Sequence, residues 1–87
     1  MAELFLEIWD ERKPVRCFET GVLMGNWLRE NSCCYHHVLE KELYPEYKYE
    51  KWNIIIILPS VHEQVHNDIH KCPKIEQLRK ELKEEHE

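Results

Sequence analysis

An unbroken apolar run, Ile54-Ile55-Ile56-Ile57-Leu58, constrains the fold more than any other feature of the chain. β-branched residues without polar alternation favour a strand that is covered on both faces. Trp52 and Asn53 precede the run and Pro59 follows it, which predicts a strand over 52–58. Because a chain of 87 residues can build only one core around such a strand, we expect residues 1–87 to form a single domain.

Helical patterns flank this strand on both sides. Apolar residues at helical spacing predict a first helix over 3–12 that ends near Pro14. The pattern Ser60-Val61-His62-Glu63 is typical of a capping box and predicts a helix from Ser60 to about Lys71, stopped by Pro73. A last helix is expected over 74–85, with one apolar face formed by Ile75, Leu78 and Leu82.

The remaining segments are shorter or irregular. Residues 15–32 contain both glycines and are expected to form turns or a short hairpin. Residues 34–39 have strand character, and a charged, tyrosine-rich loop over 40–51 separates them from the isoleucine strand. The sequence therefore predicts a small α+β fold.

The charge balance weighs against some functions. The formal net charge is −5 and the basic residues are scattered, so a module that only grips DNA phosphates is disfavoured. An enzyme that brings a divalent cation to one phosphate needs less positive charge of its own. The first residues carry acids where a signal peptide is basic, and no apolar run could span a bilayer, so we expect a cytoplasmic protein without membrane contact.

Four cysteines form no Cys-x-x-Cys pair, and reduced thiols are the default without a secretory signal. A structural zinc site would combine Cys17, one of Cys33 and Cys34, and Cys72, although buried free thiols are the commoner outcome.

Histidines are dense, and their positions matter more than their number. His62 and His66 stand four residues apart on the expected helix, so both side chains project from one face and can share a divalent cation. His36 and His37 are adjacent on the expected strand, and Asn53 opens the isoleucine run. His70 continues the helical stripe, which keeps open the reading of a polar helix face.

Together these elements resemble the HNH (ββα-metal) nucleases. Residues 34–66, from Cys-Tyr-His-His-Val-Leu through Trp-Asn-Ile-Ile-Ile-Ile-Leu-Pro-Ser-Val-His-Glu-Gln-Val-His, look like an HNH motif, and the core motif is expected over 34–70. The segment is similar to bacteriocin DNase domains and more so to small phage HNH endonucleases. Residues 7–12 and 17–21 are also similar to those phage proteins, so the resemblance covers about two-thirds of the chain.

This resemblance implies a metal-dependent endonuclease that hydrolyses phosphodiester bonds of DNA. His37 matches the general base and Asn53 the residue that orients it. His36, His62 and His66 match the ligands of one divalent metal ion, whose identity (Mg, Mn, Zn or Ni) stays open. Arg12 or Arg16, or Lys13 between them, is the candidate to contact the substrate phosphate; no spacing distinguishes them, and a surface role is the commoner outcome.

Two other readings remain. The chain could be a non-catalytic or partner-dependent metal-stabilised binding module, such as a phage packaging accessory. The last helix could then bind a protein partner or form a homodimer, although packing on its own domain is the simpler expectation. The aromatic residues of the 40–51 loop and Trp52 could touch nucleic acid, but packing is favoured there too.

Overall fold

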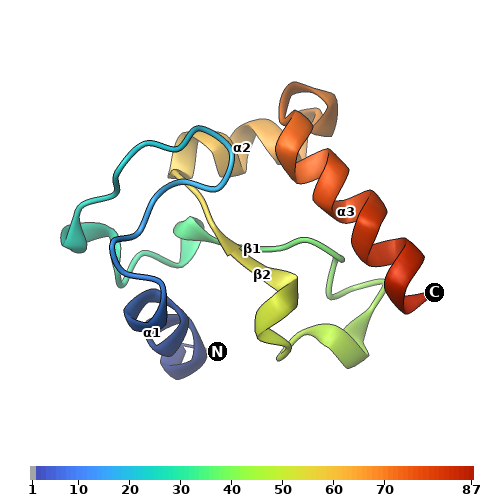
Figure 1. The fold of residues 1–87 in the computed structure, drawn as a ribbon, viewed down its shortest axis with the longest axis horizontal. Helices are drawn as coiled ribbons and strands as arrows, with labels where there is room; N and C mark the ends of the chain where they lie inside the picture. The colour runs from blue at the N-terminus through green and yellow to red at the C-terminus, as the bar shows by residue number, and fades with distance from the viewer. Residues whose placement is uncertain (1) are drawn as a thin grey trace.

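The computed structural model describes residues 2–87 and has an α+β architecture. Helix α1 (Ala2–Glu11) is followed by strands β1 (Tyr35–His37) and β2 (Ile54–Ile56), then by helices α2 (Pro59–Asn67) and α3 (Pro73–His86). The two strands lie in the middle of the molecule, and the three α-helices surround them on different sides (Figure 1). None of these helices has the length and apolar character that crossing a membrane requires.

The two strands form an antiparallel ribbon in which His36 pairs with Ile55. Hydrogen bonds from Ile57 N to Cys34 O (2.8 Å) and from Val38 N to Asn53 O (2.9 Å) extend the pairing at both ends. The expected strand over 52–58 is shorter than predicted, because Lys51–Asn53 form a 3₁₀ turn. All four isoleucines, Ile54–Ile57, are buried, which agrees with a strand covered on both faces.

Helix α2 begins earlier and ends earlier than the sequence pattern predicts. Leu58 is the N-cap and Pro59 occupies the first turn, so the capping box expected at Ser60 does not form. Proline suits this place because its fixed φ is helical and its missing N–H would have no helical partner. The helix stops at Asn67, and the Asp68 side chain then accepts a hydrogen bond from His70 N (3.0 Å) to cap a separate 3₁₀ turn.

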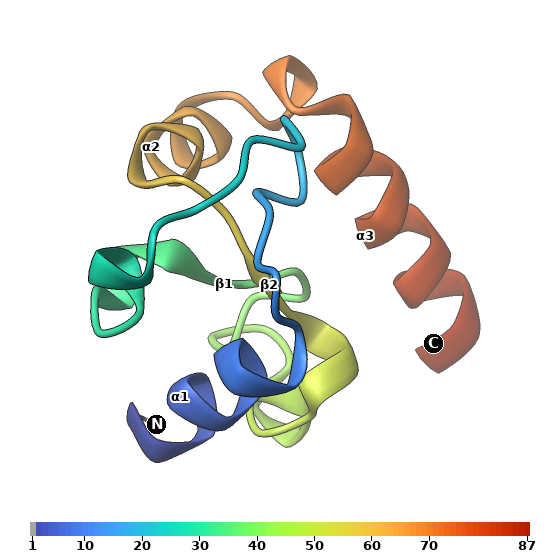
Figure 2. The ribbon, with the colours of Figure 1, turned by 60° about the vertical axis from the view of Figure 1, so that its left-hand side comes forward.

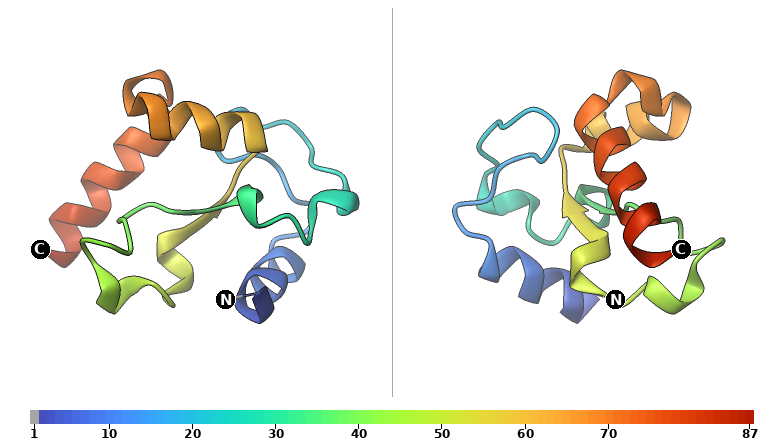
Figure 3. Two further views of the ribbon diagram at one scale, coloured as in Figure 1. Left: turned by 180° about the vertical axis from the view of Figure 1, so that it is seen from behind. Right: turned by 45° about the vertical axis from the view of Figure 1, so that its right-hand side comes forward.

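Helix α3 packs along one side of the molecule, opposite α1, as two turned views show (Figures 2 and 3). Pro73 is its first residue rather than only the stop signal of the preceding helix. Ile75 and Leu82 are buried and Leu78 packs against them, so the apolar face of α3 is used within the domain's own core.

The segment between α1 and β1 contains the expected hairpin. Arg16 bridges to Leu23, and Gly21 turns the chain with a φ of 76°, a left-handed conformation that glycine adopts without steric cost. From this hairpin, the Glu19 carboxylate accepts hydrogen bonds from Ile75 N (2.9 Å) and Lys74 N (3.3 Å). The hairpin thus caps the N-terminus of α3 from far away in the sequence.

Candidate metal centre

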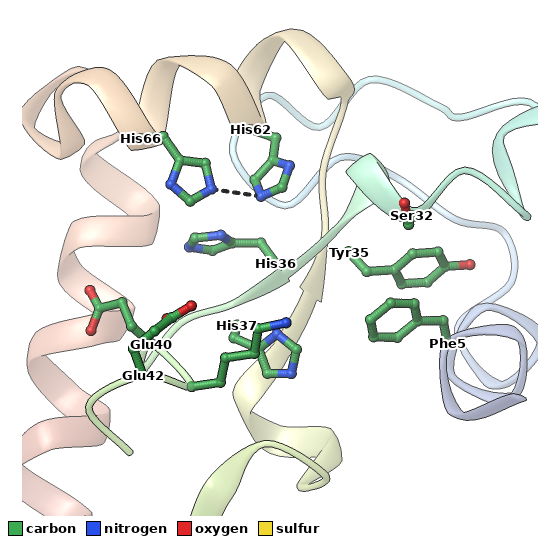
Figure 4. Close-up of a pocket in the computed structure, with 10 residues that line it drawn as sticks. Phe5, Ser32, Tyr35, His36, His37, Glu40, Glu42, His62 and His66 are labelled. Atoms are coloured by element: carbon green, nitrogen blue, oxygen red, sulfur yellow. Dashed lines mark hydrogen bonds between the residues drawn. The ribbon is translucent and has the colours of Figure 1, made fainter. Parts of the chain in front are cut away.

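Three histidines from two elements meet between β1 and α2. His62 and His66 project from α2 towards the ribbon, and His36 rises from β1 to meet them (Figure 4). The helical period places the first two on one face, and the strand places the third opposite them. Each histidine offers one ring nitrogen as a possible ligand, and these three nitrogens lie within 4.8 Å of one another.

The rings are arranged closely enough to share one ion. His62 Nε2 and His66 Nε2 are 2.9 Å apart, and the His36 ring centroid lies 5.4 Å from that of His62 and 5.7 Å from that of His66. His36 is buried, His62 is half-buried and His66 is exposed. The cluster therefore has a deep end in the core and an open end at the surface, and it could hold a metal ion.

The electrostatics of the cluster suit a cation. Burial and the neighbouring rings of His62 and His66 lower the pKa of His36 to about 4. Burial and His66 also lower the pKa of His62, while a main-chain hydrogen bond with Cys33 opposes that shift. His36 is therefore neutral at pH 7, the form in which imidazole binds metals.

A cavity of about 320 Å³ adjoins the three ligands, and His37 lines it as well. Because successive strand residues alternate, the His37 ring lies on the other side of β1 from His36 (Figure 4). His37 Nε2 lies 2.9 Å from Lys48 O, and since a carbonyl can only accept, Nε2 carries the proton. In the neutral ring, Nδ1 is then the nitrogen able to accept a proton.

The Asn53 side chain contacts the main chain of the long loop rather than the His37 ring. Its fully buried amide accepts a hydrogen bond from Leu39 N (2.7 Å) and donates to Leu39 O (3.0 Å) and Tyr47 O (3.3 Å). The side chain does not hold the His37 ring directly, because its hydrogen-bonding atoms are used on the main chain. Asn53 instead fixes the loop that carries the Lys48 carbonyl, and this carbonyl holds His37.

Arg12 and Arg16 lie away from the histidine cavity and line another one. Arg12 donates to Ile54 O (2.7 Å) and Lys51 O (2.9 Å), which fastens the end of α1 to β2. Arg16 donates to Gly21 O (3.1 Å) within its own hairpin. Their guanidinium groups thus donate to main-chain carbonyls, and the structure does not bring these two residues to the histidine cavity.

Three charged residues that the sequence analysis did not select, Glu40, Lys41 and Glu42, line the cavity instead. Lys41 is exposed there and close enough to His37 to lower its pKa, although burial is the larger cause. Glu40 also lines the cavity, and its two oxygens accept hydrogen bonds from Arg79 of α3 (3.0 and 3.1 Å). Their only sequence signal is that they lie three to five residues after His37.

Several alternatives from the sequence now have definite places. His70 is exposed and pairs with Glu76 (2.5 Å) rather than joining the cluster. Cys17, Cys34 and Cys72 are buried free thiols, and within residues 2–87 the His36, His62 and His66 group is the one able to hold a metal.

The aromatic residues of the long loop are used mainly for packing, as favoured from the sequence. Trp52 stacks on His86 of α3 with ring centroids 3.9 Å apart, and Tyr47 packs against both rings. Tyr49 differs from them because it is 61% exposed.

Comparison with known protein families, with curated proteins and with solved structures finds no match to this chain. The geometry itself defines a small α+β protein with a three-histidine cluster that could hold a metal ion beside a fourth, oriented histidine.

Proposed function

We propose that this protein is a metal-dependent endonuclease of the HNH (ββα-metal) type that hydrolyses phosphodiester bonds of DNA. The observation that carries the proposal is the joining of two different histidine sites at one cavity. Three rings converge in an arrangement that could hold a metal ion, and the ring of a fourth, His37, is oriented by a main-chain carbonyl. A purely structural metal site has no need of an oriented fourth histidine with a free ring nitrogen.

The proposed chemistry assigns a task to each residue. His36, His62 and His66 would hold the ion, and their three neutral nitrogens leave positions open for substrate and water. A bound divalent ion supplies positive charge that stabilises a phosphate as negative charge grows on it. His37 accepts a proton from the attacking water at Nδ1, because Nε2 is engaged by Lys48. Lys41, at the rim of the cavity, attracts the phosphate.

Two preferences compete over which metal ion the site would hold. Three imidazoles bind zinc or nickel more tightly than harder ions, whereas the HNH resemblance implies activity with magnesium or manganese. We therefore propose one divalent ion and leave its choice to measurement.

The decisive experiment incubates supercoiled plasmid and, separately, single-stranded circular DNA with the purified protein and Mg²⁺, Mn²⁺, Ni²⁺ or Zn²⁺ in turn. Wild-type protein is compared with His37→Ala, with an EDTA control, and with His70→Ala as a matched histidine loss outside the cluster. Relaxation or linearisation that requires both the metal and His37, and survives His70→Ala, supports the proposal. No cleavage by a folded, metal-loaded protein would contradict it and favour a binding module.

A further inference from the structure

A second cavity of about 300 Å³ adjoins the histidine cavity on the side of α1. Both cavities are lined by Phe5, Ser32 and Tyr35, so one surface continues from the candidate metal centre into the second hollow. We call this second cavity the aromatic groove. Its other lining residues are Ala2, Leu6, Arg29 and Glu30.

The part shared by the two cavities carries a rigid pair of stacked rings. Phe5 and Tyr35 lie nearly parallel, with an interplanar angle of 6° and centroids 4.4 Å apart. Figure 4 shows the pair on the opposite side of the site from Glu40 and Glu42. Tyr35 is buried and donates its hydroxyl to Arg29 O (2.5 Å), which fixes its ring. Phe5 is only partly buried and also lies near the ring of His37, with centroids 6.2 Å apart.

The charges around the aromatic groove do not favour binding through phosphates, whether of a duplex or of a single strand. The Arg29 guanidinium is already paired with Asp10: Nε donates to one carboxylate oxygen (2.9 Å) and Nη2 to the other (2.7 Å). Glu30 adds an acid to the lining, and the whole chain has a net charge of −5. Binding here must therefore depend on flat apolar contact more than on charge.

We infer that the aromatic groove receives an unpaired nucleobase next to the cleaved phosphate, so that the substrate class is single-stranded nucleic acid. A base within a duplex is stacked and paired, and it cannot enter a side cavity unless it is flipped out. An unpaired base is free to lie against the ring of Phe5, and stacking on an aromatic ring tolerates every base. This inference rests on the proposed function, because it takes the substrate to be a phosphodiester chain.

The test measures binding separately from cleavage. Fluorescence anisotropy follows a fluorescein-labelled single strand of mixed sequence, and the same strand paired with its complement, in EDTA. The proteins are wild type, Phe5→Leu, and Phe18→Leu as a matched loss of a phenyl ring outside both cavities. We expect wild type to bind the single strand more tightly than the duplex. Phe5→Leu should weaken single-strand binding by about tenfold, and Phe18→Leu should leave it unchanged.

A second pair of variants covers the case in which Phe5→Leu does not fold. Ser32 is exposed and lies where the two cavities meet, so Ser32→Glu places a negative charge in the path of the strand without removing core packing. Ser32→Glu should weaken single-strand binding, whereas Ser32→Ala should not. Equal binding of single strand and duplex by wild type, absence of binding to either, or unchanged binding by the folded groove variants would overturn the inference. Failure to cleave both plasmid and single-stranded circular DNA would refute only the nuclease, because the binding measurement involves no turnover.

Discussion

The ring of His37 donates a hydrogen bond from Nε2 to the main-chain carbonyl of Lys48, 2.9 Å away. The partner comes from the long loop between the two strands, so the orientation of this histidine depends on the loop keeping its shape. Asn53 maintains that shape by binding Leu39 and Tyr47 at the two sides of the loop. A buried amide in the core and an oriented histidine in the cavity are thus parts of one arrangement.

Replacing Asn53 by alanine should therefore lower both stability and activity. The change leaves the buried Leu39 carbonyl and N–H and the partly buried Tyr47 carbonyl without their side-chain partner, which costs about 3 kcal/mol of the free energy of unfolding. Urea denaturation of Asn53→Ala, with the exposed Asn67→Ala as control, measures this loss. A cost below about 1 kcal/mol would show that the loop does not depend on the amide.

Metal binding should stabilise the folded chain through the histidine cluster. An ion at about 100 times its Kd adds about 2.7 kcal/mol to the free energy of unfolding, which corresponds to a rise in Tm of roughly 10 °C or more. His62→Ala should abolish this rise, and His70→Ala should preserve it because His70 pairs with Glu76 outside the cluster. Thermal unfolding with and without each metal tests this, and a shift that survives His62→Ala would place the ion elsewhere.

Without metal, the protein should lose stability in mild acid. Burial lowers the pKa of His36 from 6.5 to about 4, so between these values the unfolded chain takes up a proton that the folded chain lacks. The stability is therefore complete above pH 6.5 and falls as the pH drops towards 4, by about 2 kcal/mol between pH 7 and pH 5. Urea titrations in EDTA at several pH values measure the slope of the free energy of unfolding against pH. The slope should flatten in His36→Asn, and an unchanged slope would exclude His36 as its source.

Removing the positive charge of Lys41 should weaken the use of substrate rather than the binding of metal. Lys41→Ala should lower kcat/KM by roughly tenfold, mainly through KM. It should also reduce the slope of log K for DNA binding against log salt concentration by about one. Lys41→Arg should restore part of the loss because it keeps the charge. Lys80→Ala removes an exposed lysine of α3 as a control. The same decrease in both alanine variants would mean that net charge, not position, is responsible.

Replacing Glu19 by glutamine or alanine should destabilise α3 from a distance. The carboxylate accepts from two main-chain N–H groups at the helix N-terminus, where a negative charge is also favoured by the helix dipole. Glu19→Ala should cost about 1 kcal/mol of the free energy of unfolding, and Glu19→Gln less, since it retains an acceptor. Chemical denaturation beside the exposed Glu84→Ala gives the comparison. Equal stability of all three variants would contradict this capping role.

Local patterns in the sequence were enough to predict the main elements. The isoleucine run predicted a buried strand, the spacing of apolar residues predicted the first and last helices, and Gly21 indicated a hairpin turn. The same kind of reasoning placed His62 and His66 on one helix face, because the helical period depends only on sequence separation. It failed at Ser60, where a proline at the first helical position replaced a side-chain cap.

By itself, the sequence determined which residues could form a strand, a helix face or a pair of metal ligands, because those properties depend on neighbours along the chain. Only the tertiary structure decided which side chains meet. It brought His36 under α2, turned Arg12 to the carbonyls of β2, gave His37 the carbonyl of Lys48 and set Phe5 beside Tyr35. These partners are distant in sequence and are selected by how the loop and helices pack, which no local periodicity encodes.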